Sequence, residues 1–172
     1  LRKKTFFDDD CVVHIPMSSP TCKKLMHLCC KTLDKIKLRR HLGGTYICIE
    51  GPQFSTLAES KLYRSWGCDV IGMTNMPEAK LAKEAGICYA TISMVTDYDC
   101  WHPDHESVTI NQIIDTLNKN SENAFKFINQ LTKEKEIICN DETKSLSKKS
   151  LITDLTKIKK TTKSKLKIIL NI

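Results

Sequence analysis

The chain has 172 residues, enough for one hydrophobic core, and no apolar run reaches the roughly 20 residues of a membrane span, so we expect one domain and no membrane partner. Its net charge of +7 is uneven, because residues 141–172 hold nine lysines and three acidic residues, which leaves +1 for residues 1–140. A nearly neutral body with a lysine-rich end that lacks aromatic residues argues against a nucleic-acid-binding groove.

The first half of the chain predicts two helices separated by a strand. Residues 21–37 form an amphipathic helical pattern, which Ser19 could cap and Pro20 could begin. Residues 45–51 are β-branched and aromatic and end at Gly-Pro, as a strand does. Residues 54–66 predict a second helix, with Ser55 as its cap and Gly67 as its stop.

The second half continues the alternation of strands and helices. Residues 68–73 and 87–97 predict two more strands, and residues 77–86 predict a helix between them. Apolar residues from 110 to 131 predict one long helix or two shorter ones. The order β-α-β-α-β-α is typical of the α/β class with a partly parallel sheet.

The composition changes near residue 135. We therefore divide the chain into a main body, 1–135, and a lysine-rich tail, 136–172. A helical tail and a disordered tail both agree with its sequence.

The nine cysteines are odd in number, are irregularly spaced and form no C-x-x-C pair. This pattern predicts reduced thiols, and hence a cytoplasmic protein that could also reside in the nucleus.

Three segments follow the predicted strands: EGPQFS (50–55), GMTNMPE (72–78) and TDYDCWHPDH (96–105). Ligands of α/β sheets collect at the carboxyl ends of the strands, so we expect these segments to face one crevice. In the second segment, Thr74 precedes a helix and could bind an anion such as phosphate or simply cap that helix. In the first, Phe54 could stack on a flat ligand or belong to the core.

The third segment is open to two functional interpretations. Cys100, His102 and His105 superficially resemble metal ligands, but zinc sites normally use two spaced pairs, and no second pair is apparent, so we expect no metal. Asp97 and Asp99 could point to the same side of a strand end, where two neighbouring acids can keep a proton and grip a protonated nitrogen. Capping of a turn is the alternative.

Three blocks of this sequence closely resemble methylthioadenosine phosphorylases, a family in the trimeric branch of the purine nucleoside phosphorylases. They are EGPQFSTLAES (50–60), GCDVIGMTNMPEAKLAKEAGICYA (67–90) and TDYDCW (96–101). The resemblance extends over about residues 5–130 and fades in the tail. It implies an α/β fold with a mixed, partly barrel-like central sheet flanked by helices. It also implies phosphorolysis of 5′-deoxy-5′-methylthioadenosine to adenine and 5-methylthioribose 1-phosphate, in purine and methionine salvage.

The resemblance also assigns roles to residues. Asp97 is the implied catalytic residue and reads the adenine edge together with Asp99, while Thr74 holds phosphate. Other substrate-binding residues are implied at the base and sugar (Phe54, Ser55, Met73) and at the methylthio end (Val108, Ile110, and His14 at a boundary between subunits of a homotrimer). No cofactor is implied, since inorganic phosphate is a co-substrate.

Asp97 bears on specificity, because phosphorylases of 6-oxopurines carry asparagine at the matching position. A carboxylate accepts a hydrogen bond from an amino group and disfavours a carbonyl, so Asp97 favours adenine. A 6-oxopurine phosphorylase and a truncated, non-catalytic remnant are the alternatives.

The sequence departs from the family in two ways. Gly72 stands where some relatives have asparagine, which we expect to be tolerated. No segment matches the family's Gly-rich phosphate loop or its arginine–histidine phosphate pair, so we expect a C-terminal portion that lacks the N-terminal strands and is inactive alone.

Overall fold

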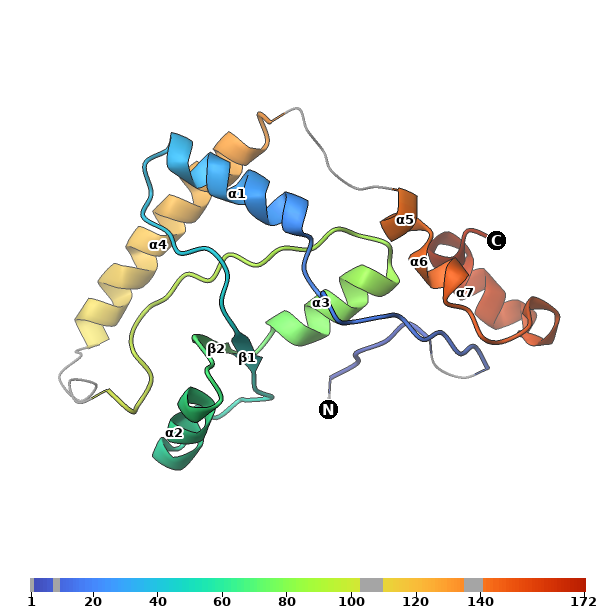
Figure 1. Ribbon diagram of the computed structural model, residues 1–172, viewed down its shortest axis with the longest axis horizontal. Helices are drawn as coiled ribbons and strands as arrows, with labels where there is room; N and C mark the ends of the chain where they lie inside the picture. The colour runs from blue at the N-terminus through green and yellow to red at the C-terminus, as the bar shows by residue number, and fades with distance from the viewer. Residues whose placement is uncertain (1, 8–9, 103–109, 135–140) are drawn as a thin grey trace. The chain divides into compact units, whose positions relative to one another are not determined.

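The computed structural model describes residues 2–7, 10–102, 110–134 and 141–172 (Figure 1). In chain order its elements are α1 (Lys23–Lys35), β1 (Tyr46–Cys48), α2 (Leu57–Ser65), β2 (Val70–Gly72), α3 (Asn75–Glu84), α4 (Ile110–Leu131), α5 (Asp141–Lys144), α6 (Leu146–Lys149), a 3-10 helix (Leu155–Lys157) and α7 (Lys160–Leu170).

The two strands pair in parallel and are connected through α2. Tyr46 lies opposite Val70, and Cys48 lies opposite Gly72. Parallel neighbours need a crossover connection, which α2 supplies here. This β-α-β unit confirms the predicted α/β class, although both strands are shorter than the segments 45–51 and 68–73.

The start of α2 differs by one residue from the prediction. Thr56 is its N-cap: the Thr56 hydroxyl accepts from Glu59 N at 3.2 Å, and Glu59 Oε2 accepts from Thr56 N at 2.8 Å. This reciprocal capping box satisfies two backbone donors at once. The prediction that Ser55 caps this helix is therefore wrong, and Ser55 is left to a different role.

The helix α1 begins at Lys23, so Ser19 and Pro20 lie before it and the predicted cap is wrong. Ser19 O accepts from Lys83 Nζ at 2.6 Å, and Cys22 N donates to Tyr89 O at 2.7 Å. These tertiary contacts hold the residues ahead of the helix in a non-helical path.

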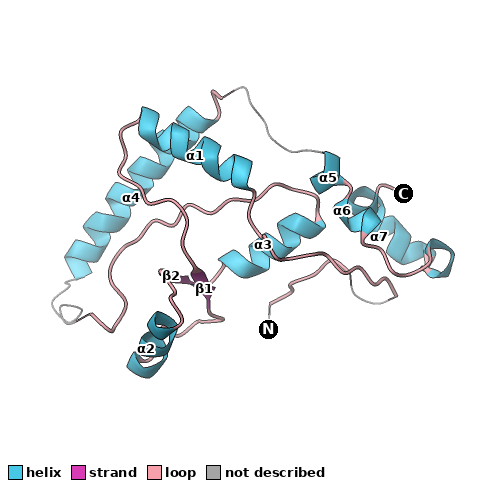
Figure 2. Cartoon of the chain, in the orientation of Figure 1, coloured by secondary structure: helices cyan, strands magenta, loops and turns pink. Residues whose placement is uncertain are grey.

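The prediction of a strand over 87–97 is wrong. Figure 2 draws the described residues between α3 and α4 as loop, and among the described residues no strand pairs with them. Tyr89 O accepts from Cys22 N, and Val95 O accepts from Asn120 Nδ2 at 3.1 Å. Two of its carbonyls are thus engaged by a loop amide and a helix side chain, where a strand would use a ladder partner.

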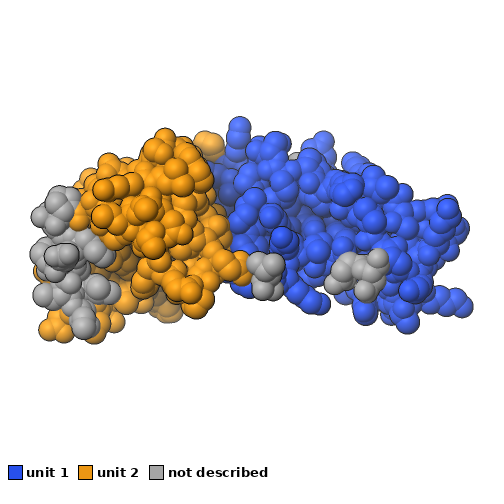
Figure 3. Space-filling view, turned by 90° about the horizontal axis from the view of Figure 1, so that it is seen from below, with its two compact units in different colours: residues 1–26, 76–91, 137–172 blue, residues 27–75, 92–136 orange. Residues whose placement is uncertain are grey.

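The chain forms two compact units, coloured separately in Figure 3. One contains residues 1–26, 76–91 and 137–172, and the other contains residues 27–75 and 92–136. The helices α5, α6 and α7 of the tail thus group with the first residues of the chain. The division at residue 135 stays a prediction.

The core of the first unit joins the N-terminal segment to the tail. Phe7 and Cys11 are buried with Ile158, Leu166 and Leu170. An antiparallel bridge between Val13 and Leu151 extends this contact. Leu166 and Leu170 therefore form a buried face of α7.

At the start of α7, Asp10 acts as a capping residue from far along the chain. Its carboxylate accepts from Lys159 N and from Thr162 Oγ1, both at 2.6 Å. The hydrogen bond from Thr162, followed by that from the Lys159 backbone, lowers the pKa of Asp10.

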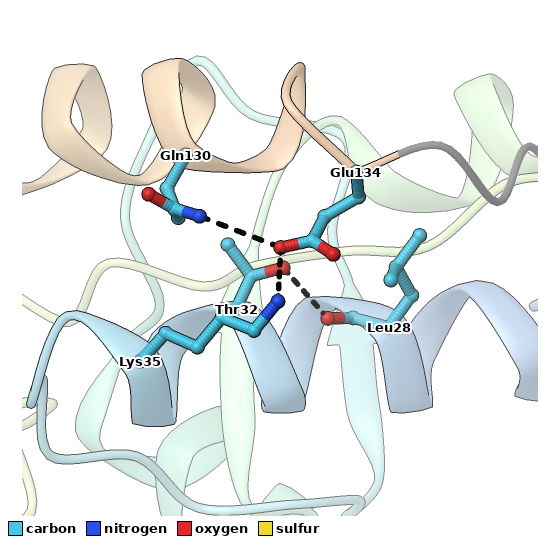
Figure 4. Close-up of polar contacts among 5 residues, drawn as sticks. All are labelled: Leu28, Thr32, Lys35, Gln130 and Glu134. Atoms are coloured by element: carbon cyan, nitrogen blue, oxygen red, sulfur yellow. Dashed lines mark hydrogen bonds and ion pairs between the residues drawn. The ribbon is translucent and has the colours of Figure 1, made fainter.

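In the second unit, α1 is joined to the residues that follow α4 (Figure 4). Lys35 Nζ lies 2.5 Å from Glu134 Oε1, and the hydrogen bond from Lys35 lowers the pKa of Glu134. Gln130 Nε2 donates to the same oxygen at 3.4 Å. Residues 110–131 form one continuous helix, which resolves the open choice between one helix and two.

The eight cysteines within the described ranges are all free, as the sequence predicts. Burial raises the pKa of the Cys11 and Cys29 thiols. Among the residues described, no helix has the length and apolar character needed to cross a membrane.

Candidate functional site

The loop that follows β1 contacts the end of β2 at its first residues. Ile49 N donates to Gly72 O at 2.9 Å, so parallel pairing continues one residue past the strand. Gly51 has a φ of +69°, and a Cβ built there would lie 2.6 Å from Met73 Sδ. Glycine at 51 therefore meets both a backbone and a steric requirement, and the Met73 side chain rests against this loop.

Gly72 is also in close contact, but with a protein side chain. A Cβ built on Gly72 would lie 1.8 Å from the Tyr46 hydroxyl oxygen. An asparagine, which some relatives carry here, requires the Tyr46 ring to move. The expectation that asparagine is tolerated at 72 therefore depends on a Tyr46 rearrangement.

The same loop contacts the segment with the two aspartates at its other end. Cys100 Sγ donates to Ser55 O at 3.5 Å, across 45 residues of sequence. Cys100 N donates to Asp99 Oδ1 at 2.9 Å, and His102 N donates to Asp99 O at 3.0 Å. Ser55 and Asp99 are thus brought together through Cys100. The loop over residues 49–55 connects both of the other predicted site segments.

Ser55 carries the most unusual polar atom of this loop. Its Oγ is buried and has no hydrogen-bond partner, one of two such side-chain atoms among the described residues. A buried hydroxyl without a partner is costly, so such groups call for an explanation in function or strain. Phe54 beside it is 88% exposed, which excludes the core interpretation for this ring.

Asp97 and Asp99 lie on a loop, so their predicted place at a strand end is wrong. Asp97 is exposed, and its Oδ1 accepts from Thr96 Oγ1 at 3.2 Å. Asp99 is half-buried and holds the turn described above. The turn-capping alternative is therefore satisfied for Asp99 through its Oδ1.

Thr74 is exposed and directly precedes α3, as both interpretations of this residue require. The N-terminus of a helix of ten residues offers free N–H groups and partial positive charge. Its phosphate role stays a prediction.

An aromatic cluster around the aspartates was not predicted from the sequence. Tyr98 and His102 stack with ring centroids 4.3 Å apart, and Trp101 meets His102 edge to face at 5.1 Å. The guanidinium carbon of Arg64 lies 3.5 Å from the centroid of the Trp101 ring. Rings at i, i+3 and i+4 were visible in the sequence, but the partner Arg64 comes from α2.

The metal interpretation finds no support in the part of the chain that the structure describes. No group of three or more potential ligands occurs there, and His102 stacks on Tyr98. His105 lies outside the described residues.

Three other predicted residues are not brought to this site by the described contacts. His14 is exposed and belongs to the other unit, where its N–H donates to Ser150 O at 3.2 Å. Ile110 begins α4. Val108 lies outside the described residues. Their roles at the methylthio end stay predictions.

Comparison with known proteins identifies a family for most of the chain. The model of the phosphorylase superfamily matches residues 1–133. An S-methyl-5′-thioadenosine phosphorylase of Gloeobacter violaceus is 58% identical over 131 residues, which are 74% of this chain and 44% of the relative. Another, of Koribacter versatilis, is 47% identical over 173 residues, which are 98% of this chain and 58% of the relative. The chain thus spans about half the length of these curated relatives.

Solved structures agree with this family. A methylthioadenosine phosphorylase from an antarctic soil metagenomic library superposes with a TM-score of 0.87 at 40% identity, over 98% of this chain and 60% of the other. The methylthioadenosine phosphorylase of Schistosoma mansoni in complex with adenine gives a TM-score of 0.77 at 26% identity, over 88% of this chain and 62% of the other. Both confirm the predicted fold. The chain belongs to the phosphorylase superfamily, and over the part that it spans it matches S-methyl-5′-thioadenosine phosphorylases.

Proposed function

We propose that the complete protein catalyses phosphorolysis of 5′-deoxy-5′-methylthioadenosine to adenine and 5-methylthioribose 1-phosphate. The observation that carries the proposal is the contact of Cys100 Sγ with Ser55 O, because it joins the loop after β1 to the turn that holds Asp99. The names of the relatives support this choice of substrate, and so does the adenine bound in the structure of the Schistosoma mansoni enzyme.

The chemistry requires help for the departing base. The C–N bond breaks through a sugar with oxocarbenium character, so adenine must leave without becoming a bare anion. Asp97, as the catalytic residue, supplies a proton or a strong hydrogen bond at N7, and general acid help of this kind contributes about 10²–10⁴-fold. Asp99 accepts from the 6-amino group.

The remaining groups bind and orient the substrate. The unpartnered Ser55 hydroxyl gains a hydrogen bond to the base, and the exposed Phe54 ring covers base and sugar. Met73 packs under the ribose. Thr74 and the N-terminus of α3 hold phosphate, which is the nucleophile and balances the developing positive charge.

The assembly and setting of the enzyme are part of the proposal. Ile110 lines an apolar slot for the methylthio group, and His14 of a neighbouring subunit closes it in a homotrimer. The enzyme uses phosphate as co-substrate without a further cofactor. It acts in purine and methionine salvage in the cytoplasm and nucleus.

The test is a product assay on the full-length gene product. We expect release of adenine from methylthioadenosine that depends on added phosphate, with 5-methylthioribose 1-phosphate formed in equal amount. Faster cleavage of inosine than of methylthioadenosine would identify a 6-oxopurine phosphorylase. Adenine binding without any phosphate-dependent turnover would identify a non-catalytic protein.

A further inference from the structure

The segment that carries both aspartates is attached to α2 and its preceding loop at two points. One is the hydrogen bond from Cys100 Sγ to Ser55 O, just ahead of the helix. The other is the contact of Arg64, in the last turn of α2, with the Trp101 ring. Both anchors lie within two residues of Asp99, so α2 is in a position to set where that carboxylate lies.

The contact of Arg64 with Trp101 has the geometry of a cation–π interaction. At 3.5 Å from the ring centroid, the guanidinium is well inside the roughly 6 Å limit for such contacts, and tryptophan is the best aromatic partner. Trp101 in turn meets His102, which stacks on Tyr98. Arg64 therefore anchors a cluster of rings that brackets Asp99 in the sequence.

We propose that Arg64 is a positioning residue for Asp99, the acid assigned to the 6-amino group, and that it acts through Trp101. In this role Arg64 acts on the turn and not on the substrate itself. By holding Trp101 it fixes the turn over residues 99–102 and, with it, the carboxylate of Asp99. This inference rests on the proposed function, because Asp99 has this task only in an enzyme that binds aminopurines.

The consequence concerns discrimination between purines. A carboxylate that is held in place accepts a hydrogen bond from a 6-amino group and repels a 6-carbonyl oxygen. A carboxylate on a mobile turn can move away from that carbonyl. Loss of the anchor therefore lowers turnover of the 6-amino substrate more than turnover of its 6-oxo analogue. General destabilisation of the protein would lower both equally.

The experiment compares Arg64→Ala, Arg64→Lys and Lys61→Ala in the full-length gene product. Lys61 is an exposed residue of the same helix and serves as the matched control. One readout is the ratio of kcat/KM for methylthioadenosine to kcat/KM for methylthioinosine, both with phosphate. The other is amide hydrogen exchange over residues 98–102. For an exposed cation–π contact we expect Arg64→Ala to change each readout about two- to five-fold.

The expected pattern is a lower ratio and faster exchange in Arg64→Ala, substantial recovery in Arg64→Lys, and wild-type behaviour in Lys61→Ala. The inference is overturned if the wild type cleaves methylthioadenosine but Arg64→Ala leaves the ratio and the exchange unchanged, or lowers turnover of both substrates equally. A wild type without phosphate-dependent turnover contradicts the proposed function itself, so the two failures are distinguishable.

Discussion

At the scale of single residues, the site differs from its sequence interpretation most at Ser55. Its position before a helix suggested a cap, but Thr56 takes that role and leaves the Ser55 hydroxyl buried without a partner. The Ser60 hydroxyl on α2 is also buried without a partner among the described residues. Ser60 can therefore serve as a control for Ser55, because only Ser55 is assigned to the site.

We predict that Ser55→Ala separates stability from activity. Removing an unpaired buried hydroxyl removes its desolvation penalty, so Tm by calorimetry is unchanged or slightly higher. The variant loses a hydrogen bond to the base, worth about 0.5–1.5 kcal/mol, so kcat/KM for methylthioadenosine falls about two- to ten-fold. Ser60→Ala should keep both values. Full kcat/KM in Ser55→Ala would remove this residue from the binding site.

For Asp97 and Asp99, the sequence indicated the chemical role but not the location in the fold. Their identity suggested an acid pair, the family resemblance implied that this pair reads the purine edge, and the contacts of Cys100 bring Asp99 to Ser55. Their location was misjudged, because residues 87–97 look like a strand, while the carbonyls of Tyr89 and Val95 accept from Cys22 and Asn120. Such partners come from distant parts of the chain and leave no local pattern.

At the scale of elements, helix boundaries were predictable where capping chemistry is local. Gly67 and Gly86 were expected to end α2 and α3, and both follow those helices with positive φ. The start of α1 was not predictable, because Lys83 and Tyr89 hold the residues ahead of it. The same holds for α7, whose first turn is capped by Asp10 from the opposite end of the sequence.

The cap on α7 predicts a pH dependence of stability. Hydrogen bonds from Thr162 and then from Lys159 N lower the pKa of Asp10 below its ordinary 3.8. The unfolded chain therefore binds this proton more readily than the folded chain. The stabilisation is complete above about pH 4 and is lost as pH falls through the lower folded-state pKa.

Urea unfolding between pH 2 and pH 7 tests this dependence. We expect Asp10→Asn to lower the unfolding midpoint at pH 7 and to flatten its decline in acid, relative to wild type. Identical pH profiles for the two proteins would show that Asp10 does not stabilise the folded chain through its charge.

At the scale of the whole molecule, the sequence suggested a body with an appended tail. In the structure, Leu166 and Leu170 of α7 share a core with Phe7 and Cys11, and residues 141–172 group in one compact unit with residues 1–26. The lysines obscured this helix face, because its buried members are widely spaced among them. Family resemblance faded over the same stretch and gave no help there.

We predict opposite outcomes for two apolar residues of α7. Leu170 is fully buried, so Leu170→Ala lowers the free energy of unfolding by about 2–5 kcal/mol. Ile168 is 94% exposed, so Ile168→Ala changes it by less than about 0.5 kcal/mol. Denaturant titration measures both. Equal effects of the two substitutions would mean that the tail does not pack as described.

The most direct test of the account is the purine preference of Asp97→Asn in the full-length gene product. Asparagine cannot supply the acid at N7, and its amide N–H can donate to a 6-carbonyl, which a carboxylate disfavours. We predict that kcat/KM for methylthioadenosine falls about 10²–10⁴-fold, while the ratio of 6-oxo to 6-amino turnover rises. Wild-type kcat/KM for methylthioadenosine in Asp97→Asn would contradict the assignment of Asp97 as the residue that assists the departing adenine.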